Sequence, residues 1–457
     1  MGVLLSLLLL PQISLLSTFS SSISSPIPSI FFFSPHCLKQ TFPYFTMRFH
    51  ARDVFVNGTI TANLFVSSYI GTISTLQLSR SLNGSYALNT LSVNNVTTDN
   101  PSWLHKDPKN GILYCLNEGL SVQNGSISSF SVAGNGDLSL LGNGLTISGP
   151  VSSVLFNGGR NMAAAHYSGA SLTTHNIQAD GTLSPLQTLT FTMPGPGPDP
   201  LQRQLTPHPH EALLDPTEKY IIVPDLGADL VRVFSIDPAT ALLTEQTPCT
   251  APPASGPRHG AFHVTDGGDT YFYLVSELAN TVSSFKVTYG EGSEGMTFTN
   301  IDTHGIYGDE KIPEGAAAAE CLLTPDGKHI LTSSRNATLL SIPQPPTHPL
   351  NNTALPSDTI QAWSINTASN STYGSLSFSQ LFPSGGIFPR QMSLNKAGTL
   401  VAIALQRSAR VVIAKRDPKT GLFGDFVADV QVGVFEGVDG LNGQVTSVIW
   451  DEVEEIY

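Results

Sequence analysis

Short strand-like runs separated by turns recur along the chain from Asn63 onward, and they follow one order. A proline or small residue begins a first strand, an Asp-Pro or Asp-Gly turn follows, and a second, apolar strand comes next. A polar turn, a third strand of alternating residues and a fourth strand complete the unit. One clear copy runs through residues 101–105, 112–116, 126–132 and 136–141. Runs of this length between turn residues predict small antiparallel sheets.

The unit recurs several times, which indicates a repeat fold. Further copies begin at Pro209, Pro257, Ala319 and Pro389, and a more degenerate copy occupies residues 150–191. Units of four short strands at a spacing of roughly 40 to 70 residues are typical of β-propeller blades. Together with the first copy, they make six complete blades.

A seventh blade is divided between the two ends of the chain. Residues 63–69 read as a second strand whose first strand is missing, and residues 444–450 supply a suitable strand at the other end. Pairing the two removes the open sheet edge that would otherwise invite aggregation. A solenoid would instead need a capping repeat at each end. We therefore predict an all-β protein, a seven-bladed β-propeller of four-stranded antiparallel blades whose ring is closed by strands from both termini.

The extent of the repeat sets the predicted domain boundaries. Residues 1–46 form an N-terminal extension, 47–62 a linker, 63–452 the propeller and 453–457 a tail.

The extension begins with an apolar run at residues 3–10, followed by a serine-rich stretch at 17–25. This order is similar to that of a secretory signal peptide, although no basic residue precedes it and no small-x-small cleavage site follows. We expect a secreted protein, or a cytoplasmic one if translation starts at Met47. Serine and proline interrupt the apolar runs, so no membrane span is expected.

The net charge and the cysteine content limit the kinds of ligand that the protein is expected to bind. The formal net charge is −13 and no basic run is interleaved with aromatic residues, so nucleic acid is not expected to bind. A few local arginines can still make a pocket attractive to a small anionic substrate. Cys37, Cys115, Cys249 and Cys321 are far apart and form no Cys-x-x-Cys pair, which favours buried thiols over a disulfide framework or a zinc site.

Candidate functional residues lie where first strands start and second strands end, because these positions converge at one end of a propeller. They are His208, His210, Arg258, His259, Glu277, Glu320, Arg335 and Arg390. Each residue alone is better explained as a salt bridge between blades, a solvated strand end or a structural histidine. Together they favour an anionic ligand, because cations recur at equivalent points of three blades and repel one another unless an anion meets them.

These residue types suit acid–base chemistry on an anionic substrate. Arginine forks onto carboxylate or phosphate groups. A histidine near cations has a lowered pKa and can act as a base, while a glutamate can orient that base or handle a second proton. The chain has no Gly-x-Ser-x-Gly nucleophile elbow, His-Glu-x-x-His helix or phosphate-binding glycine loop. We therefore predict non-covalent catalysis that uses no metal and no cofactor.

Several longer motifs stand at the same positions. They are Pro-His-Pro-His-Glu-Ala at 207–212, Val-Pro-Asp-Leu-Gly-Ala-Asp-Leu-Val at 223–231, Gly-Pro-Arg-His at 256–259, Ser-Glu-Leu-Ala-Asn-Thr-Val at 276–282, Pro-Asp-Gly-Lys at 325–328 and Phe-Pro-Arg-Gln at 388–391. In these motifs the chain resembles the seven-bladed propeller lactonase family, which includes bacterial-type 6-phosphogluconolactonase and the fungal carboxy-cis,cis-muconate lactonizing enzyme. The resemblance covers nearly all of the predicted propeller and has the character of the ascomycete branch.

The resemblance implies catalytic roles for His210, Arg258, Glu277 and Arg335. We expect substrate contacts from His208, His259, Glu320 and Arg390. The family's usual Ser-Asn-Arg reads Ser-Ser-Arg at 333–335, a departure that affects a neighbouring polar contact rather than the arginine.

Two reactions are compatible with this set. In lactone hydrolysis, His210 or Glu277 activates water; in cyclisation, a substrate carboxylate adds to its own double bond while an acid protonates carbon. We expect a lactonase or cycloisomerase that acts on a small anionic cyclic ester or its open-chain acid, of the carboxymuconolactone type. Two alternatives stay open: a 6-phosphogluconolactonase that hydrolyses a phosphosugar lactone, and a non-catalytic propeller that serves as a binding scaffold.

Overall fold

The computed structural model describes residues 58–95, 100–199, 202–290, 295–343, 354–368, 372–432 and 444–452. All of them belong to one compact unit, Val56–Tyr457. The signal-like segment at 1–46, Cys37 and the tail at 453–457 lie outside the described residues. No helix long and apolar enough to cross a membrane occurs in the described ranges.

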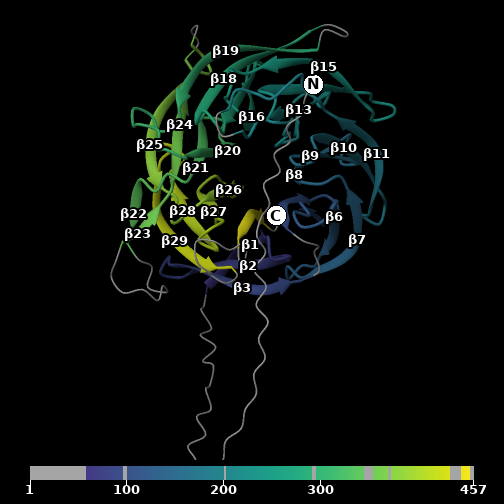
Figure 1. Cartoon of the computed structure of the whole chain (residues 1–457). Coiled ribbons are helices and arrows are strands. Elements are labelled where there is room, and N and C mark those ends of the chain that lie inside the picture. Colours follow the sequence, from purple (N-terminus) through teal and green to yellow (C-terminus); the bar gives the residue numbers. More distant parts are fainter. Residues whose placement is uncertain are drawn as a thin grey trace, which may run out of the picture. The chain divides into compact units, whose positions relative to one another are not determined.

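Seven four-stranded antiparallel sheets form the blades of a ring (Figure 1), as the sequence predicts. The first three blades, each from the innermost strand outward, contain β30 (Val445–Asp451), β1 (Gly58–Ser68), β2 (Thr72–Ser81) and β3 (Tyr86–Asn94); β4 (Pro101–Asp107), β5 (Ile112–Asn117), β6 (Gly125–Val132) and β7 (Leu138–Thr146); β8 (Pro150–Phe156), β9 (Asn161–His166), β10 (Ser171–Ile177) and β11 (Leu183–Thr190).

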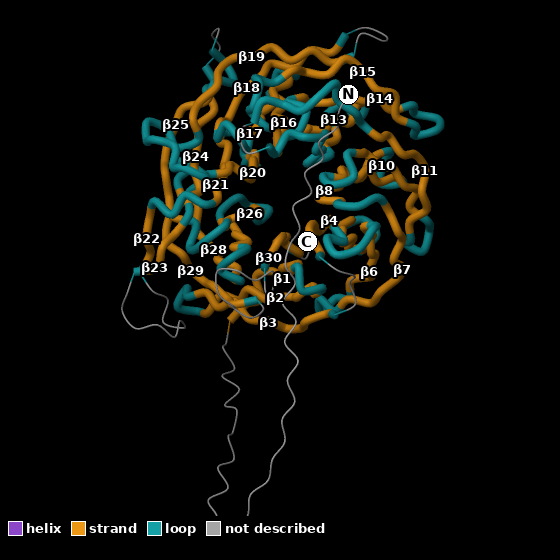
Figure 2. The backbone as a smooth tube through the Cα atoms, viewed as in Figure 1, coloured by secondary structure: helices purple, strands orange, loops and turns teal. Residues whose placement is uncertain are grey.

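The other four blades follow in the same order around the ring. They contain β12 (Leu213–Leu214), β13 (Tyr220–Asp225), β14 (Leu230–Ile236) and β15 (Leu243–Thr250); β16 (Pro257–Val264), β17 (Thr270–Ser276), β18 (Thr281–Tyr289) and β19 (Met296–Gly305); β20 (Ala317–Leu323), β21 (His329–Arg335), β24 (Thr359–Ile365) and β25 (Leu376–Pro383); β26 (Pro389–Leu394), β27 (Leu400–Leu405), β28 (Arg410–Arg416) and β29 (Phe423–Gln431). A small hairpin, β22 (Leu340–Ile342) and β23 (Leu355–Ser357), is inserted in the sixth blade. Strands joined by loops and turns make up the whole described chain (Figure 2).

Burial falls from the inside of each blade to the outside, which explains the pattern in the sequence. Every residue of the second strands β5, β9, β13, β17 and β27 is buried. These strands are covered on both faces by neighbouring blades, so they read as continuous apolar runs. The outermost strands, such as β7, have one face in solvent and alternate between exposed and half-buried residues.

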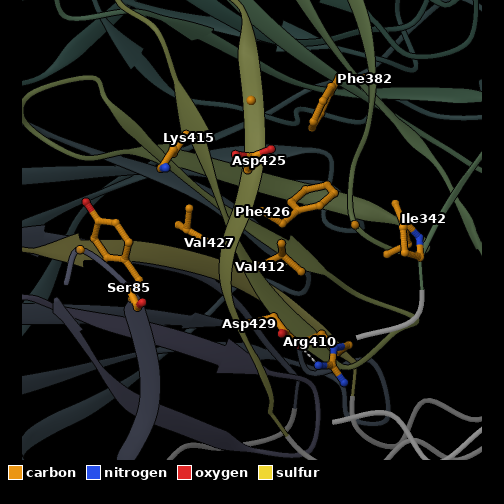
Figure 3. A pocket seen from close by; sticks show the side chains of 15 residues that line it. Ser85, Ile342, Phe382, Arg410, Val412, Lys415, Asp425, Phe426, Val427 and Asp429 are labelled. Atoms are coloured by element: carbon orange, nitrogen blue, oxygen red, sulfur yellow. Dashed lines mark ion pairs between the residues drawn. The ribbon is translucent and has the colours of Figure 1, made fainter. Parts of the chain in front are cut away.

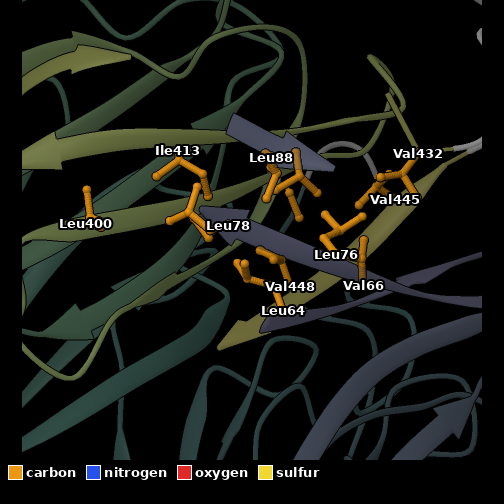
Figure 4. Packing of buried hydrophobic residues seen from close by; sticks show 13 residues of the cluster. Leu64, Val66, Leu76, Leu78, Leu88, Leu400, Ile413, Val432, Val445 and Val448 are labelled. Carbon is orange, nitrogen blue, oxygen red and sulfur yellow. The ribbon is translucent and has the colours of Figure 1, made fainter. Parts of the chain in front are cut away.

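The ring is closed by the two ends of the propeller, as predicted. β30 pairs with β1 from Asn63↔Asp451 to Ser68↔Val445. Leu64, Leu76 and Val448 pack in one hydrophobic cluster with Ile413 of the seventh blade (Figure 4). β1 begins at Gly58, five residues before the predicted start of the propeller, because its first residues pair with the end of β2.

The innermost strands share a bulge near their start. One extra residue interrupts the pairing at Thr446, Ser102, Val151, Arg258 and Arg390, and in β20 residues 319–320 lie opposite a single residue, Ser333. Bulges re-aim side chains and are common beside functional sites.

The innermost strand of the fourth blade is much shorter than the repeat predicts. A bridge joins Pro209 to Asp225, and regular pairing resumes only at Leu213. His210 and Glu211, which lie in the irregular backbone between these two points, are both buried.

Candidate active site

The predicted site residues occupy matching places in different blades. Arg258, Glu320 and Arg390 lie at the bulges of β16, β20 and β26. Glu277 directly follows β17, and Arg335 ends β21. Because the innermost strands of neighbouring blades contact one another, side chains at these places meet across blades.

Glu277 is the centre of a cluster of three arginines. Its Oε2 lies 2.9 Å from Nε of Arg258 and 2.6 Å from Nη2 of Arg335, and its Oε1 lies 2.5 Å from Nη1 of Arg203. Glu277 is 2% exposed. Arg258 and Arg335 also donate to backbone carbonyls of residues 317–319. These hydrogen bonds attach the arginine cluster to β20, the innermost strand of the sixth blade.

The arginine cluster carries a surplus of positive charge. Burial raises the pKa of Glu277, but the three guanidiniums outweigh burial and hold that pKa well below its usual range. Glu277 therefore stays ionised at neutral pH and is unsuited to donate or accept a proton. The cluster sets three guanidinium charges against one carboxylate, and this surplus suits a carboxylate or phosphate group of a ligand.

Two buried histidines and two glutamates form a second group. Nδ1 of His210 lies 3.2 Å from Nε2 of His259, and Nδ1 of His259 lies 2.8 Å from Oε1 of Glu320. Oε1 of Glu211 lies 3.9 Å from the same Nδ1, and its Oε2 accepts the amide of Gly260 at 2.7 Å. His259 and Glu320 are 1% and 2% exposed. Both residues are as deeply buried as Arg258 and Glu277, and the substrate contact expected of them stays a prediction.

Burial and charge set the protonation of this group. Burial is the main cause that lowers the pKa of both histidines; Arg258 lowers both further, whereas Glu320 opposes the shift at His259. Both rings are therefore neutral at neutral pH. Burial, together with the charge of Glu320, raises the pKa of Glu211 well above its usual range, which favours its protonated form.

Arg390 belongs to a third group, built from the first, second and seventh blades. Its Nη2 lies 3.0 Å from Oε1 of Glu118, and its Nη1 donates to the hydroxyl of Tyr69 at 2.5 Å. The Tyr69 hydroxyl in turn donates to Glu118 at 2.5 Å. Burial is the main cause that raises the pKa of Tyr69 far above its usual range. Besides burial, the positive charge of Arg390 lowers the pKa of His210, so the third group acts electrostatically on the second.

Tyr167 connects His208 to the rest of the site. The two rings stack with centroids 4.3 Å apart, and Nδ1 of His208 lies 2.9 Å from the carbonyl of Tyr167. The rings of Tyr167 and His210 form a T-shaped pair with centroids 5.6 Å apart, and the Tyr167 hydroxyl accepts a hydrogen bond from Arg203 at 3.3 Å. All eight predicted residues thus belong to connected groups.

Sequence reasoning missed five residues of the site, which are Tyr69, Glu118, Tyr167, Arg203 and Glu211. Three of them directly follow the second strands β1, β5 and β9, the place that Glu277 takes after β17. That shared place is the signal that could have found them. Arg203 lies between β11 and β12, outside the four-strand repeat, so no periodicity marks it.

A separate groove of about 860 Å³ lies between the outer strands β29, β3 and β25 (Figure 3). Val412 and Phe426 supply apolar surface there, and Arg410 pairs with Asp429. The groove contains none of the predicted site residues. In the described ranges, no three His, Cys, Asp or Glu side chains are arranged to hold a metal ion. Cys115 and Cys321 are buried free thiols and Cys249 is a half-buried one.

The chain belongs to the seven-bladed β-propeller lactonase family, because the family profile "Lactonase, 7-bladed beta-propeller" matches residues 63–438. It is similar to a protein of Arthroderma benhamiae named "Probable 6-phosphogluconolactonase", with 29% identity over 80% of this chain and 86% of that protein. It is also similar to the 6-phosphogluconolactonase of Bacillus subtilis, with 24% identity over 70% and 82% of the two chains. Among solved structures, the periplasmic gluconolactonase of Pseudomonas aeruginosa has 25% identity and a TM-score of 0.67, over 86% of this chain and 99% of that one.

Proposed function

We propose that the protein hydrolyses a small sugar lactone that carries an anionic group, with 6-phosphoglucono-δ-lactone as the first candidate. The observation that carries this proposal is the arginine cluster, whose surplus positive charge lies beside a neutral buried histidine. The names of the relatives support this alternative better than a carboxymuconolactone-type substrate. A non-catalytic scaffold would leave the buried His, Arg and Glu groups unexplained.

In the proposed reaction, His210 is the base and Glu277 is not. His210 takes a proton from water while the water oxygen attacks the lactone carbonyl. The surplus positive charge of Arg258, Arg335 and Arg203 holds the anionic substituent and favours the negative charge on the tetrahedral intermediate. The bond from carbon to the ring oxygen then breaks, and that oxygen takes the proton back from His210. One water is consumed and an open-chain acid is released.

Substrate and location are linked in this proposal. The secretory character of residues 1–46 supports a protein outside the cytoplasm, where a phosphorylated sugar lactone is an uncommon substrate. A similar solved structure is named a periplasmic gluconolactonase, so glucono-δ-lactone is the candidate for a secreted form. This lactone carries no anionic group, so the arginine cluster would act on it only through the negative charge of the tetrahedral intermediate. Sequencing the N-terminus of the mature protein from cells and from medium distinguishes the two: a start at Met47 in the cell fraction would contradict secretion.

The test is a pH-stat assay with 6-phosphoglucono-δ-lactone, glucono-δ-lactone and 3-carboxymuconolactone, corrected for spontaneous hydrolysis. We expect turnover of at least one sugar lactone, and a loss of about 10²- to 10⁴-fold in His210→Gln because the base is removed. His304→Gln is the matched control, since His304 lies in β19, outside the three groups. Turnover of carboxymuconolactone alone would instead favour the carboxymuconolactone-type substrate that the sequence predicts. No turnover by well-folded protein would contradict the proposal.

A further inference from the structure

Glu320, His259 and His210 form a hydrogen-bonded chain that leads to the proposed base. The two links are 2.8 Å between Glu320 and His259 and 3.2 Å between His259 and His210. All three side chains are more than nine-tenths buried. No described residue hydrogen-bonds Nε2 of His210, the far end of the chain.

The positions of the protons along this chain follow from its donors and acceptors. Oε1 of Glu320 accepts the backbone amide of Cys321 at 3.0 Å, so this oxygen is an acceptor and Nδ1 of His259 carries the proton between them. A neutral His259 then has its lone pair on Nε2, which accepts from Nδ1–H of His210. A neutral His210 with its proton on Nδ1 has its own lone pair on Nε2.

We propose that Glu320 and His259 are positioning residues that hold His210 in the tautomer with a basic Nε2. This role differs from the substrate contact that the sequence predicts for both residues, and its catalytic consequence rests on the proposed lactone hydrolysis. Water gives its proton to Nε2 of His210, and the resulting imidazolium keeps its Nδ1–H bond to His259. The charge of Glu320, one ring further, stabilises that imidazolium until the proton moves to the ring oxygen that leaves. The same logic applies to other chains in which a carboxylate orients a histidine.

Several titratable or charged groups face this chain and share in its electrostatics. Around His210 and His259 they are Tyr167, Glu211, Arg258, Glu320, Arg335 and Arg390. Glu211 is a useful comparison because it lies beside His259 and its raised pKa favours the neutral form, which Glu211→Gln imitates. Glu320→Gln removes a charge while its amide oxygen can still accept from the Cys321 amide and from His259.

The first test is independent of any substrate. Nitrogen NMR of the full-length protein with ¹⁵N-labelled histidine reports each ring tautomer, and His210→Gln assigns the His210 signals. We expect a pyrrole-like Nδ1 and a pyridine-like Nε2 for His210 in the wild-type protein. A protonated Nε2 with a bare Nδ1 would overturn the proposal, whatever the enzyme hydrolyses.

The second test measures kcat/KM against pH on whichever lactone the wild-type protein hydrolyses. Loss of the Glu320 charge makes His210 easier to deprotonate, so the acidic limb of Glu320→Gln moves to lower pH and the rate falls about 10- to 100-fold. Glu211→Gln should move the acidic limb less than Glu320→Gln, because the raised pKa of Glu211 already favours its neutral form. His259→Gln, whose amide oxygen can accept from His210, retains more activity than His259→Ala.

The outcomes separate this inference from the proposed function. Lower rates with an unmoved acidic limb in Glu320→Gln, or equal losses in the two His259 variants, would show a merely structural role and overturn the inference. Absence of all lactone turnover in the wild-type protein would overturn the proposed function instead. The NMR result still decides the tautomer in that case.

Discussion

At the scale of single residues, the site is governed by which charges are compensated. Glu277 is buried and touches Arg203, Arg258 and Arg335, so its carboxylate is essential to hold three cations together. Removing one partner of a buried ion pair leaves the others without compensation, which costs more than the pair itself contributes. The arginine cluster is therefore both a binding surface for anions and a point on which the fold depends.

We predict that Glu277→Gln lowers the free energy of unfolding by about 3–5 kcal/mol, because three buried or half-buried guanidiniums lose their counter-charge. Inorganic phosphate should recover part of this loss by taking the place of the carboxylate. Urea denaturation with and without phosphate measures both effects. Glu245→Gln, which removes a half-exposed partner of Arg232, is the control, with an expected change of about 0.2–1 kcal/mol. Equal losses in the two variants would contradict the prediction.

At the scale of strands, two buried histidines in the third blade are maintained in the neutral form. His166 ends β9 and His175 lies in β10, and both contact the hydroxyl of Thr173, at 2.8 and 3.0 Å. Burial lowers the pKa of His166 to about 3 and that of His175 to about 4. The strand pair is thus stable only while both rings remain uncharged.

This burial predicts acid sensitivity in a defined window. Below pH ~6.5 the unfolded chain binds protons at these histidines that the folded chain does not, so stability falls by about 1.4 kcal/mol per pH unit for each ring until pH reaches the folded-state pKa. His175→Gln lacks one of these groups. The difference in unfolding free energy between wild type and this variant, large at pH 7, should therefore shrink at pH 5. Urea titrations at the two pH values measure it, and a constant difference would contradict the prediction.

At the scale of the whole molecule, stability depends on closing the ring. β30 supplies the innermost strand of the first blade, and its Val448 packs with Leu64 and Leu76 in a cluster that also includes the seventh blade. Without β30, the edge of β1 from Asn63 to Ser68 would have no partner and would be open to pairing with another chain.

We predict that a chain lacking residues 444–457 forms soluble aggregates or oligomers and loses its cooperative thermal transition. A chain lacking only 453–457 keeps β30 and serves as the control. Light scattering after size-exclusion chromatography and a thermal scan measure both properties. If the protein lacking 444–457 is monomeric and melts at the wild-type temperature, the ring does not need β30 and the prediction is wrong.

Much of the fold can be predicted from sequence because its signals are local. Burial within one blade produces the continuous apolar second strands, the alternating outer strands and the regularly spaced turn residues. The number of blades, and the blade that is divided between the two ends of the chain, can therefore be predicted from the sequence. The eight candidate residues were also predictable, since residues such as Arg258 and Arg390 follow a proline at the same place in their blades. By itself, the sequence determined the seven-bladed ring and the types of residue available for chemistry.

Only the tertiary structure decided how those residues work together. It joins Arg390 to Tyr69 and Glu118 across the closed ring, and it brings Arg203 from outside the repeat onto Glu277. It also brings Nε2 of His259 to 3.2 Å from Nδ1 of His210. The physical reason is that each of these contacts depends on the distance between different blades and on bulges that turn a side chain to a new direction, neither of which a local pattern along one strand contains.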